Sequence, residues 1–185
     1  MNNGIRTKAL PLTAGIVRSL RAGDQVMLDG ELLTARDAAH KRLAEALARG
    51  ETLPVELRGA TVYYTGPTPA RPGRVIGSAG PTTAGRMDAW TEPLLRAGVL
   101  GMIGKGARSP AIAQALVQHG AVYLAAAGGA GAYLADRITT CAVAAYPELH
   151  SEAIHRLTVH QFPVIVAQDA HGGSIFARAA RPAPG

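Results

Sequence analysis

The sequence contains very little cysteine, and this bounds the chemistry that the chain can carry by itself. Its single cysteine, Cys141, excludes an internal disulfide and any metal or iron–sulfur site built from cysteines of this chain. The six histidines are scattered, and neither His-x-x-x-His nor Cys-x-x-Cys occurs. We therefore predict no metal site within this chain.

Long apolar runs are also missing. No stretch reaches the roughly 18 apolar residues that a membrane-spanning helix needs. The first residues, Met1–Arg6, lack the apolar block of a secretory signal. These absences predict a cytoplasmic protein without a membrane partner.

Aromatic residues are scarce, and the positive charge is not clustered. Aromatic residues make up only 4% of the chain, although its formal net charge is +6. The 19 lysines and arginines are spread along the sequence, without interleaved aromatic side chains for base stacking. We predict no nucleic-acid partner and assign part of the positive surplus to an acidic substrate, with an acidic face of a protein partner as a further assignment.

The chain does have enough apolar residues for one sizeable core. Of its 185 residues, 48% are hydrophobic and 17% are charged, which is typical of a single folded domain. We predict one domain over residues 1–177 and a flexible Ala/Pro-rich tail over residues 178–185. Extended and helical segments alternate along the domain, which predicts an α/β fold.

The expected elements follow from apolar periodicity and from turn and cap residues. Asp29-Gly30, between extended segments at 25–28 and 32–35, predicts a β-hairpin. Pro93 predicts a kink or break in a helix that begins at Thr83 or Ala84 and runs to Arg96. Further strands are expected at 5–10, 61–64, 74–76, 99–103, 121–126, 139–145, 157–159, 164–168 and 174–176, and further helices at 13–20, 37–49, 109–119 and 129–136.

The most informative segment runs from Gly80 to Asp88, Gly-Pro-Thr-Thr-Ala-Gly-Arg-Met-Asp. It places two hydroxyls, from Thr82 and Thr83, and the guanidinium of Arg86 on a tight turn before the expected helix. The free N–H groups and the positive dipole end of a helix beginning near Ala84 would face the same place. The segment suits an anion, while the alternative is an ordinary loop whose threonine caps the helix.

Two other cations stand at similar junctions. Arg36 follows an expected strand and opens a helix, where His40, four residues on, shares its face. Lys105 leaves an expected strand on a glycine loop, Gly104-Lys105-Gly106. Open α/β sheets gather ligands at such strand ends. Two guanidiniums and one ammonium suit a small substrate with two carboxylates.

Three familiar motifs are rejected. A nucleotide P-loop at Gly104-Lys105 would need Gly at position 99 and Ser or Thr at position 106, where Val99 and Gly106 stand. A dinucleotide fingerprint at Gly129–Leu134 lacks its third glycine. Ser109 has no evident His/Asp partners for a hydrolase triad.

Taken together and in this order, these segments resemble the β-subunit, or C-terminal domain, of the iron–sulfur hydro-lyases, namely class I fumarate hydratase and L(+)-tartrate dehydratase. The resemblance runs from about Leu10 to about Phe176. The matching segments are residues 30–42, 64–69, 77–88, 104–106, 120–124, 151–154 and 162–166.

The resemblance implies a three-layer β/β/α swivelling domain and half of an active site. Thr82 is similar to the catalytic base that exchanges the substrate's C3 proton, with an orienting hydrogen bond as the alternative role. Arg36 and Arg86 are similar to the clamps for the substrate carboxylates, and Lys105 to a group that activates Thr82. Thr83 is either a supporting residue or a helix cap. His40 is either a substrate contact or a surface histidine.

The resemblance also implies the other half of the site. In this family a [4Fe-4S] cluster is bound by an α-subunit or domain, which implies an α-subunit partner here and an α2β2 assembly. The implied reaction is the reversible hydration of fumarate to L-malate. Dehydration of L(+)-tartrate to oxaloacetate, a mesaconate-type reaction and a non-catalytic dicarboxylate-binding module remain alternatives. Asp37 either orients Arg36 or favours the helix N-terminus through the dipole.

Overall fold

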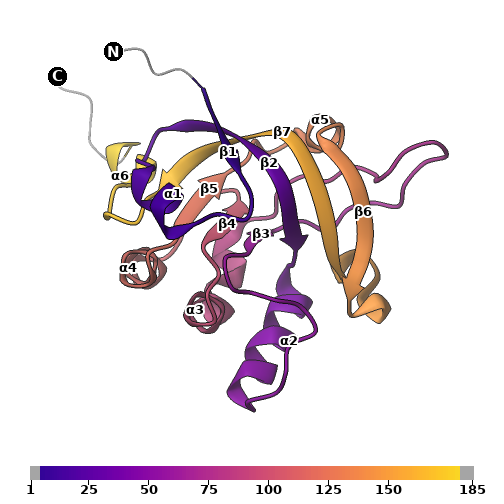
Figure 1. Cartoon of the computed structure of the whole chain (residues 1–185), viewed down its shortest axis with the longest axis horizontal. Helices are drawn as coiled ribbons and strands as arrows, with labels where there is room; N and C mark the ends of the chain where they lie inside the picture. Colours follow the sequence, from indigo (N-terminus) through magenta and orange to yellow (C-terminus); the bar gives the residue numbers. More distant parts are fainter. Residues whose placement is uncertain (1–4, 180–185) are drawn as a thin grey trace.

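The protein has a mixed α/β structure in which helices cover a curved sheet (Figure 1). The computed structural model describes residues 5–179. Residues 180–185 of the predicted tail lie outside the described residues, and Arg178 and Ala179 belong to the last helix. The α/β class predicted from the alternating pattern is confirmed.

Four parallel strands form the centre of the sheet, in the sequential order β2-β3-β4-β5. The antiparallel strand β7 pairs with both β2 and β5, so these five strands close into a ring of pairings. β1 lies parallel to β2, and β6 lies antiparallel to β7. The strands are β1 (Arg6–Ala9), β2 (Gln25–Thr34), β3 (Thr61–Tyr63), β4 (Gly101–Gly104), β5 (Val122–Ala125), β6 (Ile138–Ala145) and β7 (Ile154–Gln168).

Three helices connect the four parallel strands and lie side by side on one face of the sheet (Figure 1). Right-handed crossovers between strands in sequential order place their helices on a common face. These helices are α2 (Asp37–Ala48), α3 (Asp88–Arg96) and α4 (Pro110–His119). The shorter elements are α1 (Ala14–Ser19), η1 (Ala84–Met87), α5 (Gly131–Ala135), η2 (Pro147–Glu152) and α6 (Ile175–Ala179).

Alternate residues of each parallel strand face two different cores. In β3, Val62 belongs to the core under the helices, whereas Tyr63 belongs to a second core among the strands. Met102 and Ile103 of β4 divide in the same way. The cause is the two-residue period of a strand, and packing on both faces leaves every residue of β3 and β4 buried.

The hairpin predicted at Asp29-Gly30 is wrong, because β2 runs unbroken through these residues. Leu28 pairs with Phe162 and Gly30 pairs with Val159, so Asp29 faces two residues of β7, His160 and Gln161. This is a β-bulge, and the backbone N–H of Gln161 donates to the Asp29 carboxylate at 2.8 Å.

Three other local predictions are corrected. Residues 74–76 form no strand, and residues 175–176 begin helix α6 after Ser174 bridges to Gln168. Pro93 lies inside α3, so the break predicted there is wrong, while the predicted kink stays a prediction; the change from 3-10 to α-helix falls between η1 and α3. Within residues 5–179, no helix is both long and apolar enough to cross a membrane.

Candidate active site at the carboxyl ends of the parallel strands

The two cations predicted at strand ends lie at the same edge of the sheet. Arg36 follows β2, and Lys105 follows β4 directly. Thr34 of β2 pairs with Tyr63 of β3, which in turn pairs with Ile103 of β4. Because these strands are parallel and in register, the residues that follow them emerge at one edge, as predicted.

The Thr82-Thr83 segment is hydrogen-bonded between the ends of β3 and β4. The Thr82 N–H donates to the Tyr64 carbonyl at 2.7 Å, and the Lys105 N–H donates to the Thr82 carbonyl at 3.1 Å. The Ala84 N–H donates to the Lys105 carbonyl at 2.8 Å, so this amide at the start of η1 is not free for an anion. Thr83 occupies the cap position of η1, but its side chain makes no capping hydrogen bond.

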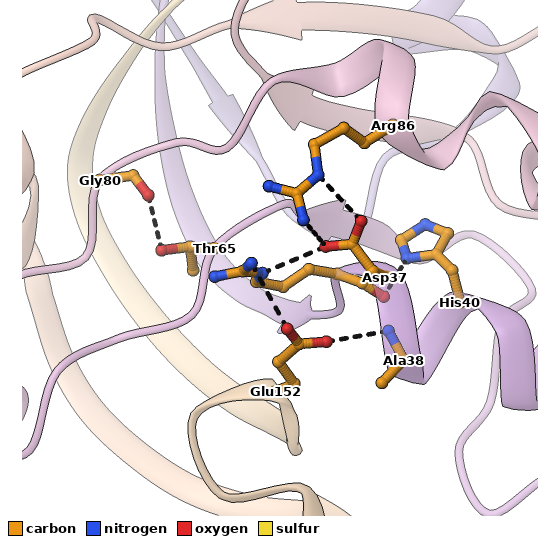
Figure 2. A network of polar contacts seen from close by, with 8 residues as sticks. Asp37, Ala38, His40, Thr65, Gly80, Arg86 and Glu152 are labelled. Carbon is orange, nitrogen blue, oxygen red and sulfur yellow. Dashed lines mark hydrogen bonds and ion pairs between the residues drawn. The ribbon is translucent and has the colours of Figure 1, made fainter.

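Asp37 joins the two predicted carboxylate clamps. Arg86 donates from Nε to Asp37 Oδ1 and from Nη2 to Oδ2, both at 3.0 Å. Arg36 Nε lies 3.4 Å from Asp37 Oδ2. Figure 2 shows that Asp37, at the start of α2, faces Arg86. Arg86 belongs to η1, the 3-10 turn that precedes α3. The predicted role of Asp37 in orienting Arg36 therefore extends to Arg86.

Glu152, which sequence reasoning missed as a site residue, binds the other side of Arg36. Its Oε1 lies 3.4 Å from Arg36 Nη2, and its Oε2 accepts the Ala38 N–H at 2.9 Å, at the start of α2 (Figure 2). Glu152 comes from η2, more than a hundred residues away, and only the matching segment at 151–154 pointed toward it. It caps α2 across the fold and holds Arg36 at the same time.

The cluster of two arginines and two carboxylates is electrostatically balanced. Arg36, Asp37 and Glu152 are about one-quarter exposed (23%, 26% and 26%), whereas Arg86 is 52% exposed. Each guanidinium carries more N–H donors than these contacts occupy, so both can bind a further carboxylate. Asp37 and Glu152 have both oxygens engaged, which suits them to positioning the arginines rather than to accepting a proton.

His40 lies behind this cluster and not on the surface. It is 1% exposed, its Nδ1 lies 3.1 Å from the Arg36 carbonyl, and its ring meets Tyr64 edge-on. Burial lowers the pKa of His40 to about 4, so the ring is neutral at pH 7. The surface alternative is wrong, and the predicted substrate contact stays a prediction.

A second buried polar group lies beneath the segment that carries Thr82 and Arg86. Arg108 has a fully buried side chain, and its Nε lies 2.6 Å from Oδ1 of Asp88. Asp88 is the last residue of the Gly80–Asp88 motif. Sequence reasoning did not single out Arg108, because it follows Lys105 in an unremarkable loop.

The residues that the structure describes do not fit an iron–sulfur cluster. The structure, over its described range, contains no group of three or more His, Cys, Asp or Glu side chains that could hold a metal ion. Cys141 is partly buried on β6, and burial raises the pKa of its thiol. A cluster would need thiolates from another polypeptide or from a further part of a longer chain.

Comparison with known proteins identifies the family of this chain. The family described as Fumarase C-terminus matches residues 3–179. A putative L(+)-tartrate dehydratase subunit beta of Methanocaldococcus jannaschii is 37% identical over 171 residues, which cover 89% of this chain and 88% of that protein.

Longer relatives share the same region. Fumarate hydratase 2 of Leishmania major is 38% identical over 158 residues, covering 84% of this chain and 28% of that protein. The aerobic class I fumarate hydratase of Salmonella typhimurium is 39% identical over 154 residues, covering 82% and 27%. The chain thus spans about a quarter of the length of these fumarate hydratases. The chain belongs to the fumarase C-terminus family, whose domain occurs in class I fumarate hydratases and in the β-subunit type of tartrate dehydratase.

Proposed function

We propose that this chain is the β-subunit component of a [4Fe-4S]-dependent hydro-lyase that reversibly hydrates fumarate to L-malate. The observation that carries the proposal is the convergence of Arg36 and Arg86 on Asp37, beside the Thr82–Lys105 ladder at the carboxyl ends of the parallel strands. Two guanidiniums at one edge suit a small substrate with carboxylates at both ends. We also expect the domain to be of the three-layer β/β/α swivelling type.

The proposed roles follow from the position of each side chain. Arg36 and Arg86 bind the substrate carboxylates through the N–H donors that Asp37 and Glu152 leave unoccupied. Asp37 and Glu152 hold the two guanidiniums in place before substrate arrives, so little side-chain ordering remains to be done on binding. Thr83 supports the two arginines from the exposed side of the site, and the neutral ring of His40 supports them from the buried side.

The proton chemistry is assigned to Thr82. In the dehydration direction its alkoxide takes the proton from the substrate's C3 and becomes the hydroxyl, and in the hydration direction the hydroxyl returns that proton and becomes the alkoxide. A threonine hydroxyl is a poor source of alkoxide at neutral pH, and we assign to the ammonium of Lys105 the role of stabilising the alkoxide. The backbone bonds between Thr82 and Lys105 keep the two residues adjacent.

The remaining chemistry requires a partner. Addition of water also needs a Lewis acid that holds the hydroxyl group, and residues 5–179 contain no donor set that fits one. We propose that an α-subunit supplies the [4Fe-4S] cluster, that the subunits form an α2β2 assembly in the cytoplasm, and that this chain is inactive alone.

Tartrate dehydration is the second candidate reaction. The relative that this chain matches nearly end to end bears the name of a tartrate dehydratase β-subunit, whereas the fumarate hydratases are several times longer. The same clamps would hold the two carboxylates of L(+)-tartrate, with oxaloacetate as the product. The third candidate function is a module that binds dicarboxylates without catalysing a reaction.

Anaerobic co-expression with a candidate α-chain tests the proposal. The purified complex is assayed against fumarate, L-malate, L(+)-tartrate and mesaconate, and its mass is measured by light scattering. We expect fumarate hydration by the complex and neither iron nor activity in this chain alone. Turnover of tartrate alone would move the assignment to the second candidate. Binding of dicarboxylates without turnover of any substrate would leave the binding module and reject the enzyme.

A further inference from the structure

We propose that the ion pair between the buried Arg108 and the partly buried Asp88 is a positioning device. It locks the Thr82–Asp88 segment and the Lys105 loop, residues 105–109, into one fixed geometry. The inference rests on the proposed function for its catalytic meaning. Its structural content concerns two loops of this chain and is tested separately from activity. Arg108 and Asp88 are positioning residues here, because neither is placed against the substrate.

Arg108 is a cation enclosed by protein on every side. Its Nη1 donates to the Tyr64 hydroxyl at 3.1 Å, and its Nη2 donates to Thr91 Oγ1 at 2.6 Å. Its guanidinium carbon lies 5.4 Å from the ring centres of both Tyr64 and Tyr123. With the ion pair to Asp88, one side chain therefore connects the end of β3, the first turns of α3, and β5.

Asp88 completes the connection with its second oxygen. Oδ1 accepts from Arg108 Nε at 2.6 Å, while Oδ2 accepts the backbone N–H of Ser109 at 2.8 Å. Asp88 is the first residue of α3, and Ser109 is the cap residue of α4. The carboxylate thus ties the C-terminal end of the Thr82–Asp88 segment to the end of the Lys105 loop.

The other ends of the same two segments are tied at the candidate site. The backbone N–H of Thr82 donates to the carbonyl of Tyr64. The hydroxyl of the same tyrosine accepts a hydrogen bond from Arg108. Lys105 bonds through its backbone to Thr82 and Ala84. Each segment is therefore fixed at both ends, by the ladder at Thr82–Lys105 and by the ion pair at Asp88–Arg108. Arg86 lies between these ties, and Lys105 belongs to one of them.

The energetics favour a role in geometry over one in stability. Replacing a buried ion pair by uncharged residues of similar size is often neutral or stabilising, whereas removing one partner leaves an uncompensated charge and is strongly destabilising. A buried pair is therefore weak evidence for stability. What this pair adds, and an apolar pair would not, is a directional set of bonds to two loops that carry Thr82, Arg86 and Lys105.

Amide hydrogen exchange on the 185-residue chain tests the structural part. In the double variant Asp88→Asn/Arg108→Met, we expect the midpoint of denaturation to stay near that of the wild type. The amides of Ala84 and Lys105 should then exchange about tenfold faster or more, while those of β2 and β7 stay protected. The double variant Glu92→Gln/Arg96→Met removes the exposed ion pair of α3, 2.8 Å long, and serves as the matched control.

Unchanged exchange at Ala84 and Lys105 in a folded double variant would overturn the inference. If that variant does not fold, Arg108→Lys, which keeps the charge but loses the planar fork, gives the same comparison. Because this readout needs no partner and no turnover, failure of the proposed function would not affect it.

Kinetics of the reconstituted complex test the catalytic part. We expect the double variant to lose about 100-fold in kcat with a much smaller change in KM, since misplacement of reacting groups costs mainly rate. Arg108→Lys should recover part of kcat. A double variant with wild-type kcat in an active complex would show that the pair has a structural role only.

Discussion

Asp37 determines how the two arginines of the site can act. As an isolated pair, Arg86 and Arg36 would repel each other, and each would spread over many rotamers. Asp37 accepts from both, and Glu152 fixes Arg36 from the opposite side. The guanidiniums are thus held ready for a carboxylate, and the residues predicted from separate segments of the sequence act as one unit.

Removal of Arg86 should affect activity much more than stability. In the reconstituted complex, Arg86→Ala should lower kcat/KM by about 100-fold or more, about 3 kcal/mol, because a charge-assisted carboxylate contact is lost. The denaturation midpoint should change little, since Arg86 is 52% exposed. Arg156→Ala is the matched control, because Arg156 is 50% exposed and pairs with Glu31 at 3.3 Å on the strands. Comparable kinetics in the two variants would remove Arg86 from the site.

His40 makes a separate contribution that depends on pH. Its pKa in the folded chain is lowered to about 4 by burial, against about 6.5 in an unfolded chain, so the unfolded state binds the proton more readily. Its neutral form therefore supports the fold fully above about pH 6.5, and this stability is lost as the pH falls toward 4. Burial lowers the pKa of His155 as well, so the overall profile contains both residues.

The variant His40→Gln should reduce this loss of stability at acidic pH. The free energy of unfolding, measured by urea denaturation from pH 7 to pH 4.5, should decline less in the variant than in the wild type. The difference should approach on the order of 3 kcal/mol at its limit. His150→Asn is the control, because His150 is exposed and asparagine tolerates its positive φ of 52°. Parallel pH profiles for wild type and His40→Gln would contradict the buried neutral histidine.

At the scale of elements, the bulge between β2 and β7 shows how a local signal can mislead. An Asp-Gly pair is the strongest short-range signal for a hairpin. Here the glycine is needed for another reason, because the backbone at Leu10 lies close to Gly30. Gly30 has a φ of +123°, and a Cβ there would lie 2.8 Å from the Leu10 carbonyl oxygen. Leu10 in turn donates its N–H to the Asp29 carbonyl at 2.7 Å.

Alanine at Gly30 should therefore destabilise the fold through two effects. Gly23 has a φ of +98° with nothing within 4 Å of its would-be Cβ, so Gly23→Ala isolates the conformational cost, about 1–2 kcal/mol. Gly30→Ala adds the clash with a backbone atom and should cost at least about 1 kcal/mol more. Urea denaturation of both variants measures the difference. Equal losses would mean that the Leu10 contact does not constrain the bulge.

The sequence predicts most of the elements and the positions of Arg36 and Lys105 at strand ends. Helix α2, the strand ends at Arg36 and Lys105, and the Thr82–Arg86 turn were accessible because caps, glycines and apolar periods are local signals. Glu152 and Arg108 were not accessible, since each acts through partners brought near only by strand order and helix packing. The sequence pattern predicts two short strands where β7 is continuous, because Pro163 and the bulge interrupt that pattern.

At the scale of the whole molecule, the parallel strands make the two cores one structure. The core under the helices and the core among the strands share every strand from β2 to β5, because neighbouring residues of a strand point to opposite faces. Loss of packing on one face should therefore release the strands on which the other face depends. The candidate site lies at the end of these shared strands and should be lost with either core.

The chain offers one natural probe for each core. Trp90, its only tryptophan, packs against the core under the helices, and Cys141, its only cysteine, packs against the core among the strands. Because the strands are shared, tryptophan fluorescence and pulsed labelling of the thiol should give the same denaturation midpoint in urea, as expected for a single cooperative unit. The variant Trp90→Phe gives the fluorescence that does not come from Trp90, and Cys141→Ser gives the labelling that does not come from Cys141. Labelling of Cys141 at clearly lower urea than the fluorescence change would mean that β6 and β7 open independently. In that case the closure of β7 on β2 and β5, which holds Glu152 against Arg36, would be a weaker constraint on the site than the pairing indicates.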